Sequence, residues 1–258
     1  MGLTYTSGKK DTLKDLFHVE KDSENDIVVA LAGNPNTGKS TAFNALTGLH
    51  QHTGNWPGKT VTNAKGKYNH KEKDFIVVDL PGTYSLLASS VEEQVARDFI
   101  CFGKPDVVVT VIDATSIERN LNLLLQILEI TPKVVVCLNL MDEAKKKEIK
   151  INVEKLENQL GVPVIPTIAR SNKGIYELKD KIYNLALGKI KTNPVKVEYN
   201  SEIQREIKKV SELLQQIFPR EISLEWLALR LLDGDESILN SISKYLDYDM
   251  KSALTKGD

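Results

Sequence analysis

Residues 33–40 carry the pattern with the clearest chemistry, a loop bounded by two glycines and followed by lysine and serine. The run fits G-x-x-x-x-G-K-[ST], the phosphate-binding loop, and reads Gly33-Asn34-Pro35-Asn36-Thr37-Gly38-Lys39-Ser40. The glycines let backbone N–H groups turn inward, and the helix N-terminus that follows adds partial positive charge. We expect Lys39 to reach the β- and γ-phosphates of a nucleotide and the Ser40 hydroxyl to ligate Mg²⁺, with Thr41 beside them.

A second motif, Asp79-Leu80-Pro81-Gly82, follows the apolar run at residues 75–78 in the strand predicted at 74–79. An acidic side chain at the carboxyl end of a buried strand lies where open α/β sheets bind ligands. We expect Asp79 to hold Mg²⁺ through water and the Gly82 N–H to meet the γ-phosphate, with Leu80 and Pro81 in the same loop. These roles predict a nucleoside triphosphate as the ligand.

Residues 49–60 follow no helix or strand period and hold two glycines, a proline and a tryptophan, so the sequence predicts an irregular loop. A loop of this length inside a compact domain is usually functional or mobile. Thr60 is the candidate Mg²⁺ ligand while a γ-phosphate is present, which would make the loop an order–disorder switch. Its neighbours are assigned to the same nucleotide site: Gly58, Lys59 and Val61. The two histidines of the loop, His50 and His52, are predicted to be solvated rather than to bind a metal.

A third motif, N-x-x-D, follows another apolar run and is the candidate site for the nucleotide base. It reads Asn139-Leu140-Met141-Asp142. The Asp142 carboxylate can accept two hydrogen bonds from the N1–H and N2–H₂ groups of guanine, whereas adenine offers no such donor pair. The pattern is weak alone but gains weight from its order after the two phosphate motifs. The backbone of Thr167-Ile168-Ala169 is the candidate contact for guanine O6. A guanine nucleotide is therefore the predicted ligand.

Apolar runs alternate with helical patterns around these motifs. Strands are predicted at 27–32, 61–69, 74–79, 107–112, 134–138 and 162–166, the second and third forming a hairpin. Helices are predicted at 40–48, 90–103, 117–130, 152–160 and 174–187, and then without intervening strands at 201–217, 222–232 and 236–246. The alternation predicts an α/β fold, a doubly wound, mostly parallel sheet with a small all-helical domain appended. The order of the phosphate and base motifs along it is similar to that of P-loop GTPases. The predicted divisions are an N-terminal extension (1–26), a GTP-binding domain (27–190) and a helical domain (191–258).

Composition restricts the classes of protein that fit. The 34 basic and 35 acidic residues give a net charge of -1, so no basic excess marks a nucleic-acid surface. The two cysteines, Cys101 and Cys137, lie in apolar surroundings and are predicted to be buried free thiols of a reducing compartment. No run approaches 18 apolar residues, so we expect no membrane span in this segment. Two further patterns receive the plainer interpretation: a chance match for the myristoylation-like N-terminus, and an interhelical turn for Asp233-Gly234-Asp235-Glu236.

Taken together, the motifs resemble those of FeoB, the bacterial ferrous-iron transporter family with a cytoplasmic GTPase domain. The resemblance covers roughly residues 27 to 246 and rests on four runs: G-N-P-N-T-G-K-S at 33–40, F-N-A-L-T-G at 43–48, G-N-W-P-G at 54–58 and D-L-P-G-T-Y-S-L at 79–86. It implies GTP hydrolysis that gates ferrous-iron uptake at the cytoplasmic face of the bacterial inner membrane. It also implies that the helical domain restrains nucleotide release and passes the nucleotide state to the pore. The implied partners are the membrane-spanning portion of the same transporter, small cytoplasmic accessory proteins and a second copy of the chain.

The same resemblance implies a potassium ion that stimulates hydrolysis, with Asn36 as its side-chain ligand. Thr83 and Tyr84, which follow the D-x-x-G motif, cannot orient water as the glutamine of Ras-type enzymes does. Catalysis would then rely on backbone groups, a bound cation or a partner, and the candidate catalytic residues are Asn36, Lys39, Thr60 and Gly82. Departures from the family pattern are the 26-residue extension, Lys59 where an aliphatic residue is common, Thr62 where an acidic one is usual, and Ile168-Ala169 in place of serine-alanine.

Two other functions stay open at this point. One is a soluble GTPase of ribosome or RNA maturation similar to Era, which would usually append an RNA-binding module with a basic face. Residues 200–246 are not basic enough for such a module. The other is an interaction module that binds nucleotide without turnover. An RNA-binding measurement and single-turnover hydrolysis would separate these functions from that of a transporter GTPase.

Overall fold

The structure is a computed structural model and describes residues 19, 21–48, 51–56, 61–87, 89–215 and 223–246. Strands in these ranges form one seven-stranded sheet in the order β2-β3-β4-β1-β5-β6-β7. Neighbouring strands are parallel from β4 through β1 to β7 and antiparallel where β3 meets β2 and β4. The bounds are β1 Ile27–Gly33, β2 Gln51–Asn55, β3 Thr62–His70, β4 Lys73–Asp79, β5 Val107–Asp113, β6 Val134–Asn139 and β7 Val164–Pro166. The predicted doubly wound, mostly parallel sheet is confirmed.

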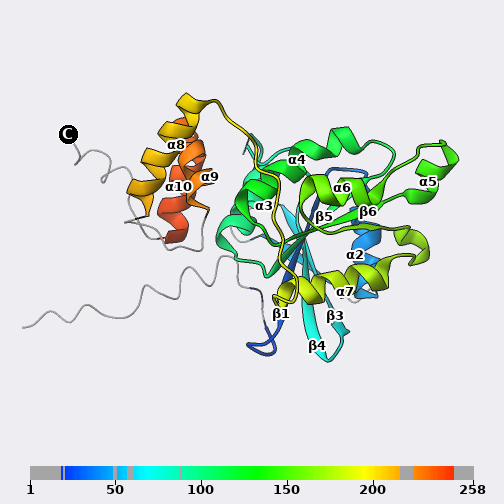
Figure 1. Ribbon diagram of the computed structural model, residues 1–258. Helices are drawn as coiled ribbons and strands as arrows, with labels where there is room; N and C mark the ends of the chain where they lie inside the picture. The colour runs from blue at the N-terminus through cyan, green and yellow to red at the C-terminus, as the bar shows by residue number, and fades with distance from the viewer. Residues whose placement is uncertain are drawn as a thin grey trace, which may run out of the picture.

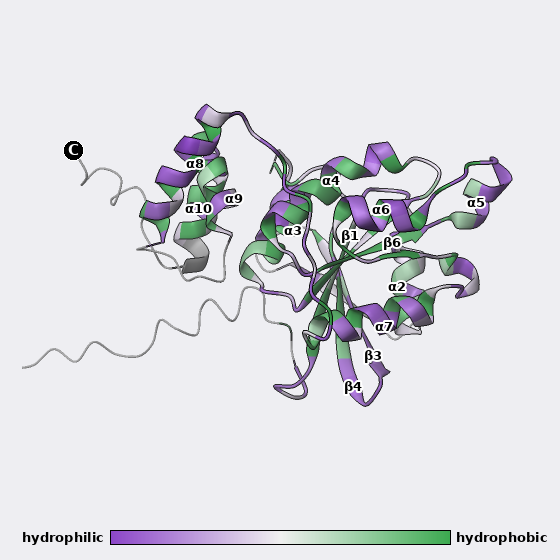
Figure 2. Cartoon of the chain, viewed as in Figure 1, coloured by the Kyte–Doolittle hydropathy of each residue, from purple (hydrophilic) through white to green (hydrophobic). Residues whose placement is uncertain are grey.

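Helices cover both faces of this sheet (Figure 1). On one face, α2 (Lys39–Thr47) and α7 (Ile175–Ala186) contribute to a buried apolar cluster with alternate residues of the central strands. On the other face, α3 (Val91–Phe102), α4 (Ile117–Ile130) and α6 (Val153–Leu160) do the same. Because the central strands are buried on both sides, most of their residues are apolar, which is the green of the sheet in Figure 2.

Strand β2 corrects the prediction that residues 49–60 form an irregular loop. Residues Gln51–Asn55 pair antiparallel with β3, with Thr53 opposite Ala64. The run Gln-His-Thr-Gly-Asn has no apolar alternation, because an edge strand of this kind gains its order from backbone hydrogen bonds to its neighbour rather than from a buried face. Two antiparallel strands therefore lie at this edge, where the sequence predicted one hairpin strand.

Two short helices were not predicted, and both begin at the base motifs. The helix α5 (Met141–Lys146) starts after Leu140, whose φ of 62° turns the chain sharply at the end of β6. The 3₁₀ helix η1 (Ala169–Ser171) follows β7. Helices of six and three residues are too short to show a period of 3.6 in the sequence.

The last helices, α8 (Ser201–Leu214), α9 (Leu224–Leu232) and α10 (Glu236–Leu246), form a helical group beside α3 (Figure 1). Residues 191–200 connect it to α7 without helix or strand. Leu227 and Ile242 of the helical group belong to the same buried apolar cluster as Val95 and Phe99 of α3. The group therefore shares a core with the sheet domain, while the predicted domain divisions stay predictions.

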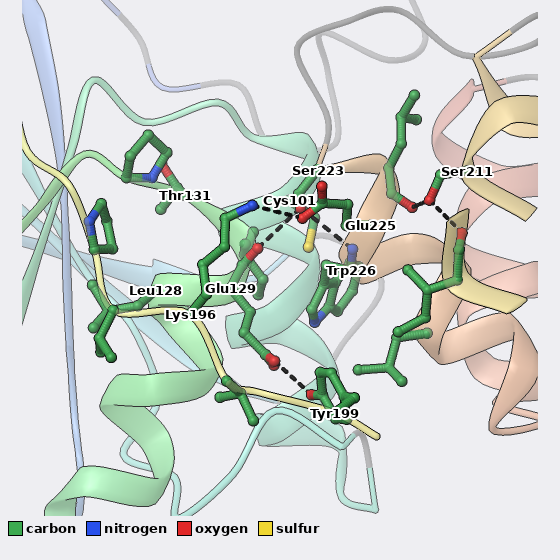
Figure 3. A pocket seen from close by; sticks show the side chains of 18 of the residues that line it. Cys101, Leu128, Glu129, Thr131, Lys196, Tyr199, Ser211, Ser223, Glu225 and Trp226 are labelled. Atoms are coloured by element: carbon green, nitrogen blue, oxygen red, sulfur yellow. Dashed lines mark hydrogen bonds and ion pairs between the residues drawn. The ribbon is translucent and has the colours of Figure 1, made fainter. Parts of the chain in front are cut away.

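A cavity of about 1230 Å³ lies between the helical group, the connecting segment and the ends of α3 and α4 (Figure 3). The Glu129 carboxylate accepts a hydrogen bond from the Tyr199 hydroxyl at 2.6 Å, and its backbone carbonyl accepts one from Ser223 Oγ at 2.9 Å. Burial and the Glu129 contact raise the pKa of Tyr199 to about 12. Lys196 of the connecting segment pairs with Glu225 of α9 at 3.0 Å (Figure 3). None of the described motif residues lines this cavity, so it is separate from the predicted nucleotide site.

Three smaller predictions can be compared with the structure. Cys101 and Cys137 are buried and free, as predicted. Residues 233–234 form the predicted interhelical turn, and Asp235 Oδ1 accepts the Ser237 N–H at 3.0 Å at the start of α10. Within the described ranges, no helix combines the length and the apolar character needed to cross a bilayer.

Candidate nucleotide site

The sequence motifs meet at the carboxyl edge of the parallel strands. β1 runs into the loop at 33–40, which we call the P-loop, and β4 ends at Asp79. β6 ends at Asn139, and β7 ends one residue before Thr167. Parallel strands bring their carboxyl ends to one edge of the sheet, where α/β proteins bind ligands. The fold thus gathers all four motifs in one place.

The shape of the P-loop requires glycine at both ends. A Cβ on Gly33 would lie 2.6 Å from the Val111 carbonyl oxygen, and one on Gly38, whose φ is 79°, would lie 2.4 Å from Asn139 Nδ2. Thr37 Oγ1 donates to the Asn34 carbonyl at 2.9 Å and braces the turn. Gly38 is also the N-cap of α2, and no side chain caps that helix. The first N–H groups of α2 are therefore left for an anion.

Asn139 ties the P-loop to the base motifs. Its side chain is buried, and Nδ2 donates to the Thr37 carbonyl at 3.1 Å. Its Oδ1 accepts from the Ala169 N–H at 3.0 Å and from Thr167 Oγ1 at 3.3 Å. The predicted contact of Thr167-Ile168-Ala169 with guanine O6 stays a prediction, and through Ala169 it would share a hydrogen already donated to Asn139.

Lys39 forms an ion pair with Asp79, the two charged groups that the sequence assigns to phosphate and Mg²⁺. Their side chains are only 11% and 19% exposed. Burial raises the pKa of the Asp79 carboxyl, and the Lys39 charge opposes this effect. Ser40 and Thr41 follow Lys39 at the exposed start of α2. The pair keeps both charges neutralised at the junction of the P-loop and β4.

The oxygen donors around this pair suit hard cations. The Ser40 hydroxyl and the Asp79 carboxylate are the ligand types that Mg²⁺ prefers. Asn36 is exposed at φ 67°, and its side chain makes no hydrogen bond to the residues that the structure describes. Its amide oxygen is thus available to a monovalent cation at the P-loop. The described donors are of the chemical types that these two ions take.

Asp142 lies in the first turn of α5 with its side chain 17% exposed. Its Oδ2 pairs with the guanidinium of Arg170 in η1. Its Oδ1 is buried and has no hydrogen-bond partner in the described part of the chain. Most buried polar atoms in native proteins have a hydrogen-bond partner, so this oxygen is a candidate acceptor for an N–H group of a ligand.

The D-x-x-G loop lies directly against the P-loop. A Cβ on Gly82 would come within 3.5 Å of Pro35 N, and the Thr83 N–H donates to the Gly33 carbonyl at 3.3 Å. The backbone of Gly82 is therefore adjacent to the loop that would wrap the phosphates. This placement is the one that the sequence motif requires.

Arg119 at the start of α4 contacts the P-loop and Tyr84, which follows the D-x-x-G motif, and it was not among the predicted site residues. Its Nη2 donates to the Tyr84 hydroxyl at 2.7 Å, and its Cζ lies 4.8 Å from the centre of the Tyr84 ring. Its carbonyl accepts from Asn34 Nδ2 at 3.3 Å. The partners are 35 and 85 residues away in the sequence, so no local spacing could have indicated this role.

The predicted switch loop is described only in part. Gly58, Lys59 and Thr60 lie outside the described residues, and their assignments stay predictions. Trp56 is buried against Phe99 of α3, with ring centres 5.3 Å apart and an interplanar angle of 65°. The Trp56 N–H donates to the Val61 carbonyl at 2.9 Å. The described flanks of the loop thus pack on α3, the helix against which the helical group also packs.

Comparison with known proteins covers both parts of the chain. Residues 27–182 match the family model for ferrous iron transport protein B, and residues 199–256 match the model for the FeoB cytosolic helical domain. The Fe(2+) transporter FeoB of Escherichia coli (strain K12) is 38% identical over 233 residues, which is 86% of this chain and 29% of that protein. The corresponding transporter of Salmonella typhimurium is 38% identical over 215 residues, 81% of this chain and 27% of its own length. The chain thus spans less than a third of the length of these curated relatives.

Solved structures show the same similarity. The cytosolic domain of T. maritima FeoB in GDP form I superposes with a TM-score of 0.77 at 40% identity, covering 84% of this chain and 85% of that one. A GMPPNP form of the same protein superposes with a TM-score of 0.76 at 39% identity, covering 84% and 86%. The cytosolic domain of L. pneumophila FeoB gives a TM-score of 0.74 at 36% identity, covering 85% and 94%.

Proposed function

The chain belongs to the ferrous iron transport protein B family, and on that premise we propose that it binds GTP and hydrolyses it to GDP and phosphate. The observation that carries the proposal is Asp142 Oδ1, which is buried without a partner among the described residues. Leaving such an acceptor unpaired costs about 1–3 kcal/mol. The N1–H and N2–H₂ groups of guanine would supply the missing donors. The GDP and GMPPNP forms of the T. maritima protein support the same class of ligand.

We assign each motif residue a role in this reaction, and the role of Thr60 rests on the sequence alone. Lys39 exchanges Asp79 for the β- and γ-phosphates, and the Gly82 N–H meets the γ-phosphate. Ser40, Asp79 and Thr60 would hold Mg²⁺, which when bound neutralises charge on the phosphate oxygens. Asn36 would hold K⁺, which when bound supplies the positive charge that an arginine finger supplies in other GTPases.

The role in the whole protein follows from the family. We propose that this portion lies at the cytoplasmic face of the bacterial inner membrane and that its nucleotide state gates Fe(II) uptake through the membrane-spanning portion of the same transporter. The contact between the helical group and α3 supports a path for this signal, because α3 also carries the anchor of Trp56. Small cytoplasmic accessory proteins and a second copy of the chain are proposed as further partners.

Phosphate release from GTP in Mg²⁺ buffer, together with nucleotide binding, tests the proposal. Asp142→Asn should weaken guanosine nucleotide binding by about 1–3 kcal/mol, or roughly 5- to 150-fold, and should shift preference toward xanthosine nucleotides. Asp74→Asn, an exposed change on β4 next to Asn69, is the matched control and should leave binding unchanged. A wild type that does not hydrolyse GTP would refute the activity. Unchanged guanosine nucleotide binding in Asp142→Asn would refute the assigned base site.

A further inference from the structure

Arg170 occupies the carboxylate that the proposed function assigns to guanine. Its guanidinium pairs with Asp142 Oδ2 and lies 3.4 Å from Glu143 Oε1. The Arg170 side chain is 60% exposed, whereas that of Asp142 is 17% exposed. The contact therefore joins a solvent-facing cation to a recessed anion, and the cation can leave without disturbing the core.

A guanidinium and the edge of guanine offer a carboxylate the same chemistry. Both are planar and present adjacent N–H donors that match the two carboxylate oxygens. In this geometry an Arg170 N–H takes an acceptor position on Asp142 Oδ2 that the base edge would also use. The two groups are therefore alternatives at one acceptor.

We propose that Arg170 is a reversible cap on the base-recognition carboxylate, which guanine must displace in order to bind. The inference rests on the proposed function and deepens it by naming a residue that sets nucleotide affinity. Glu143 offers the displaced guanidinium a second acceptor close by. Because only the uncapped fraction of molecules accepts the base, the apparent dissociation constant rises in proportion to the time spent capped.

The expected effect is modest and has a sign that distinguishes the cap from general electrostatics. A largely exposed ion pair is worth roughly a factor of two to five in an equilibrium constant, so its loss should tighten GDP binding two- to fivefold. Removing a positive charge near an anionic nucleotide would otherwise weaken binding. The cap and the long-range charge effect thus predict opposite outcomes for the same substitution.

Calorimetry or labelled-GDP titration of the whole chain tests this. Arg170→Met removes the guanidinium but keeps an apolar stem, and it should bind GDP two- to fivefold more tightly than wild type at low salt. The gain should shrink in high salt, which screens the exposed pair. Lys173→Ala removes another exposed positive charge from the same segment and should not tighten binding. Tripolyphosphate has no base and should bind Arg170→Met no more tightly than wild type.

The outcomes separate the cap from the proposed function. GDP binding that is absent from wild type, or unaffected by Asp142→Ala, would refute guanine recognition itself. GDP binding that requires Asp142 but is unchanged or weakened in Arg170→Met would refute the cap alone. Tighter binding of tripolyphosphate in Arg170→Met would also refute it, because the effect would then lie at the P-loop. Tighter GDP binding with no tighter binding of tripolyphosphate would support it.

Discussion

Replacing Arg97 by alanine should destabilise the fold more than any change to a surface charge. Arg97 lies on α3 with its side chain fully buried, at the contact with the helical group. Its Nε and Nη2 donate to Asp98 Oδ1 at 2.9 and 2.8 Å. Its Nη1 donates to Ser237 Oγ at 2.7 Å and to Asp235 Oδ2 at 3.3 Å, and Nη2 donates to Ser241 Oγ at 2.9 Å. One guanidinium therefore donates hydrogen bonds both to α3 and to the helical group.

The magnitude follows from what the substitution leaves behind. The Asp98 and Asp235 side chains are only 7% and 13% exposed, so Arg97→Ala would leave two nearly buried carboxylates without the guanidinium that pairs with both of them. Removing one partner of a buried ion pair typically costs 3–5 kcal/mol. We expect Arg97→Ala to lower the free energy of unfolding by about that amount, a large share of the 5–15 kcal/mol of a typical domain.

Urea denaturation followed by circular dichroism and by fluorescence measures this. The chain has two tryptophans, Trp56 anchored on α3 and Trp226 on α9, so fluorescence reports both sides of the contact. Arg205→Ala is the matched control, because Arg205 is 67% exposed and its contact with Glu206 is 3.6 Å long. The control should show no measurable loss. A loss below about 1 kcal/mol in Arg97→Ala would mean that the buried network does not hold the two parts together.

Three further predictions concern the site and the buried thiols. Thr60→Ala should slow GTP hydrolysis while leaving GDP affinity nearly intact, because Thr60 is expected to contact Mg²⁺ only in the triphosphate state; equal loss in both nucleotide states would contradict this. Potassium should raise the turnover of wild type above its value in matched sodium buffer, and Asn36→Ala should lose the stimulation; a variant that keeps it would exclude Asn36 as the ligand. Burial raises the pKa of Cys137 to about 11, so at pH 8 roughly one thiol in a thousand is ionised, and iodoacetamide should modify it only after denaturation, as read by mass spectrometry.

Much of the site could be predicted because its chemistry depends on local features of the chain. Gly38 could be identified because the loop pattern requires glycine at this position. The structure gives the reason, a φ of 79° with Asn139 Nδ2 close to where a Cβ would lie. Asp79 and Asn139 are recognisable since each ends a continuous apolar run, and such runs become the buried parallel strands whose carboxyl ends meet at one edge. The order of the motifs then indicated the fold and the guanine nucleotide together.

The tertiary structure alone decided which partners the buried and surface arginines meet. Arg97 and Asp235 are 138 residues apart, Arg119 and Tyr84 are 35 apart, and Arg170 and Asp142 are 28 apart. No helix or strand period relates such pairs, because their contact depends on the order of strands in the sheet and on where the helical group docks. Strand β2 shows the same limit for the backbone, since its polar residues form a strand only because β3 supplies the partner. Local backbone geometry can therefore be predicted from the sequence, because it depends on neighbouring residues. Contacts between distant segments form only once the sheet and the helical group are assembled.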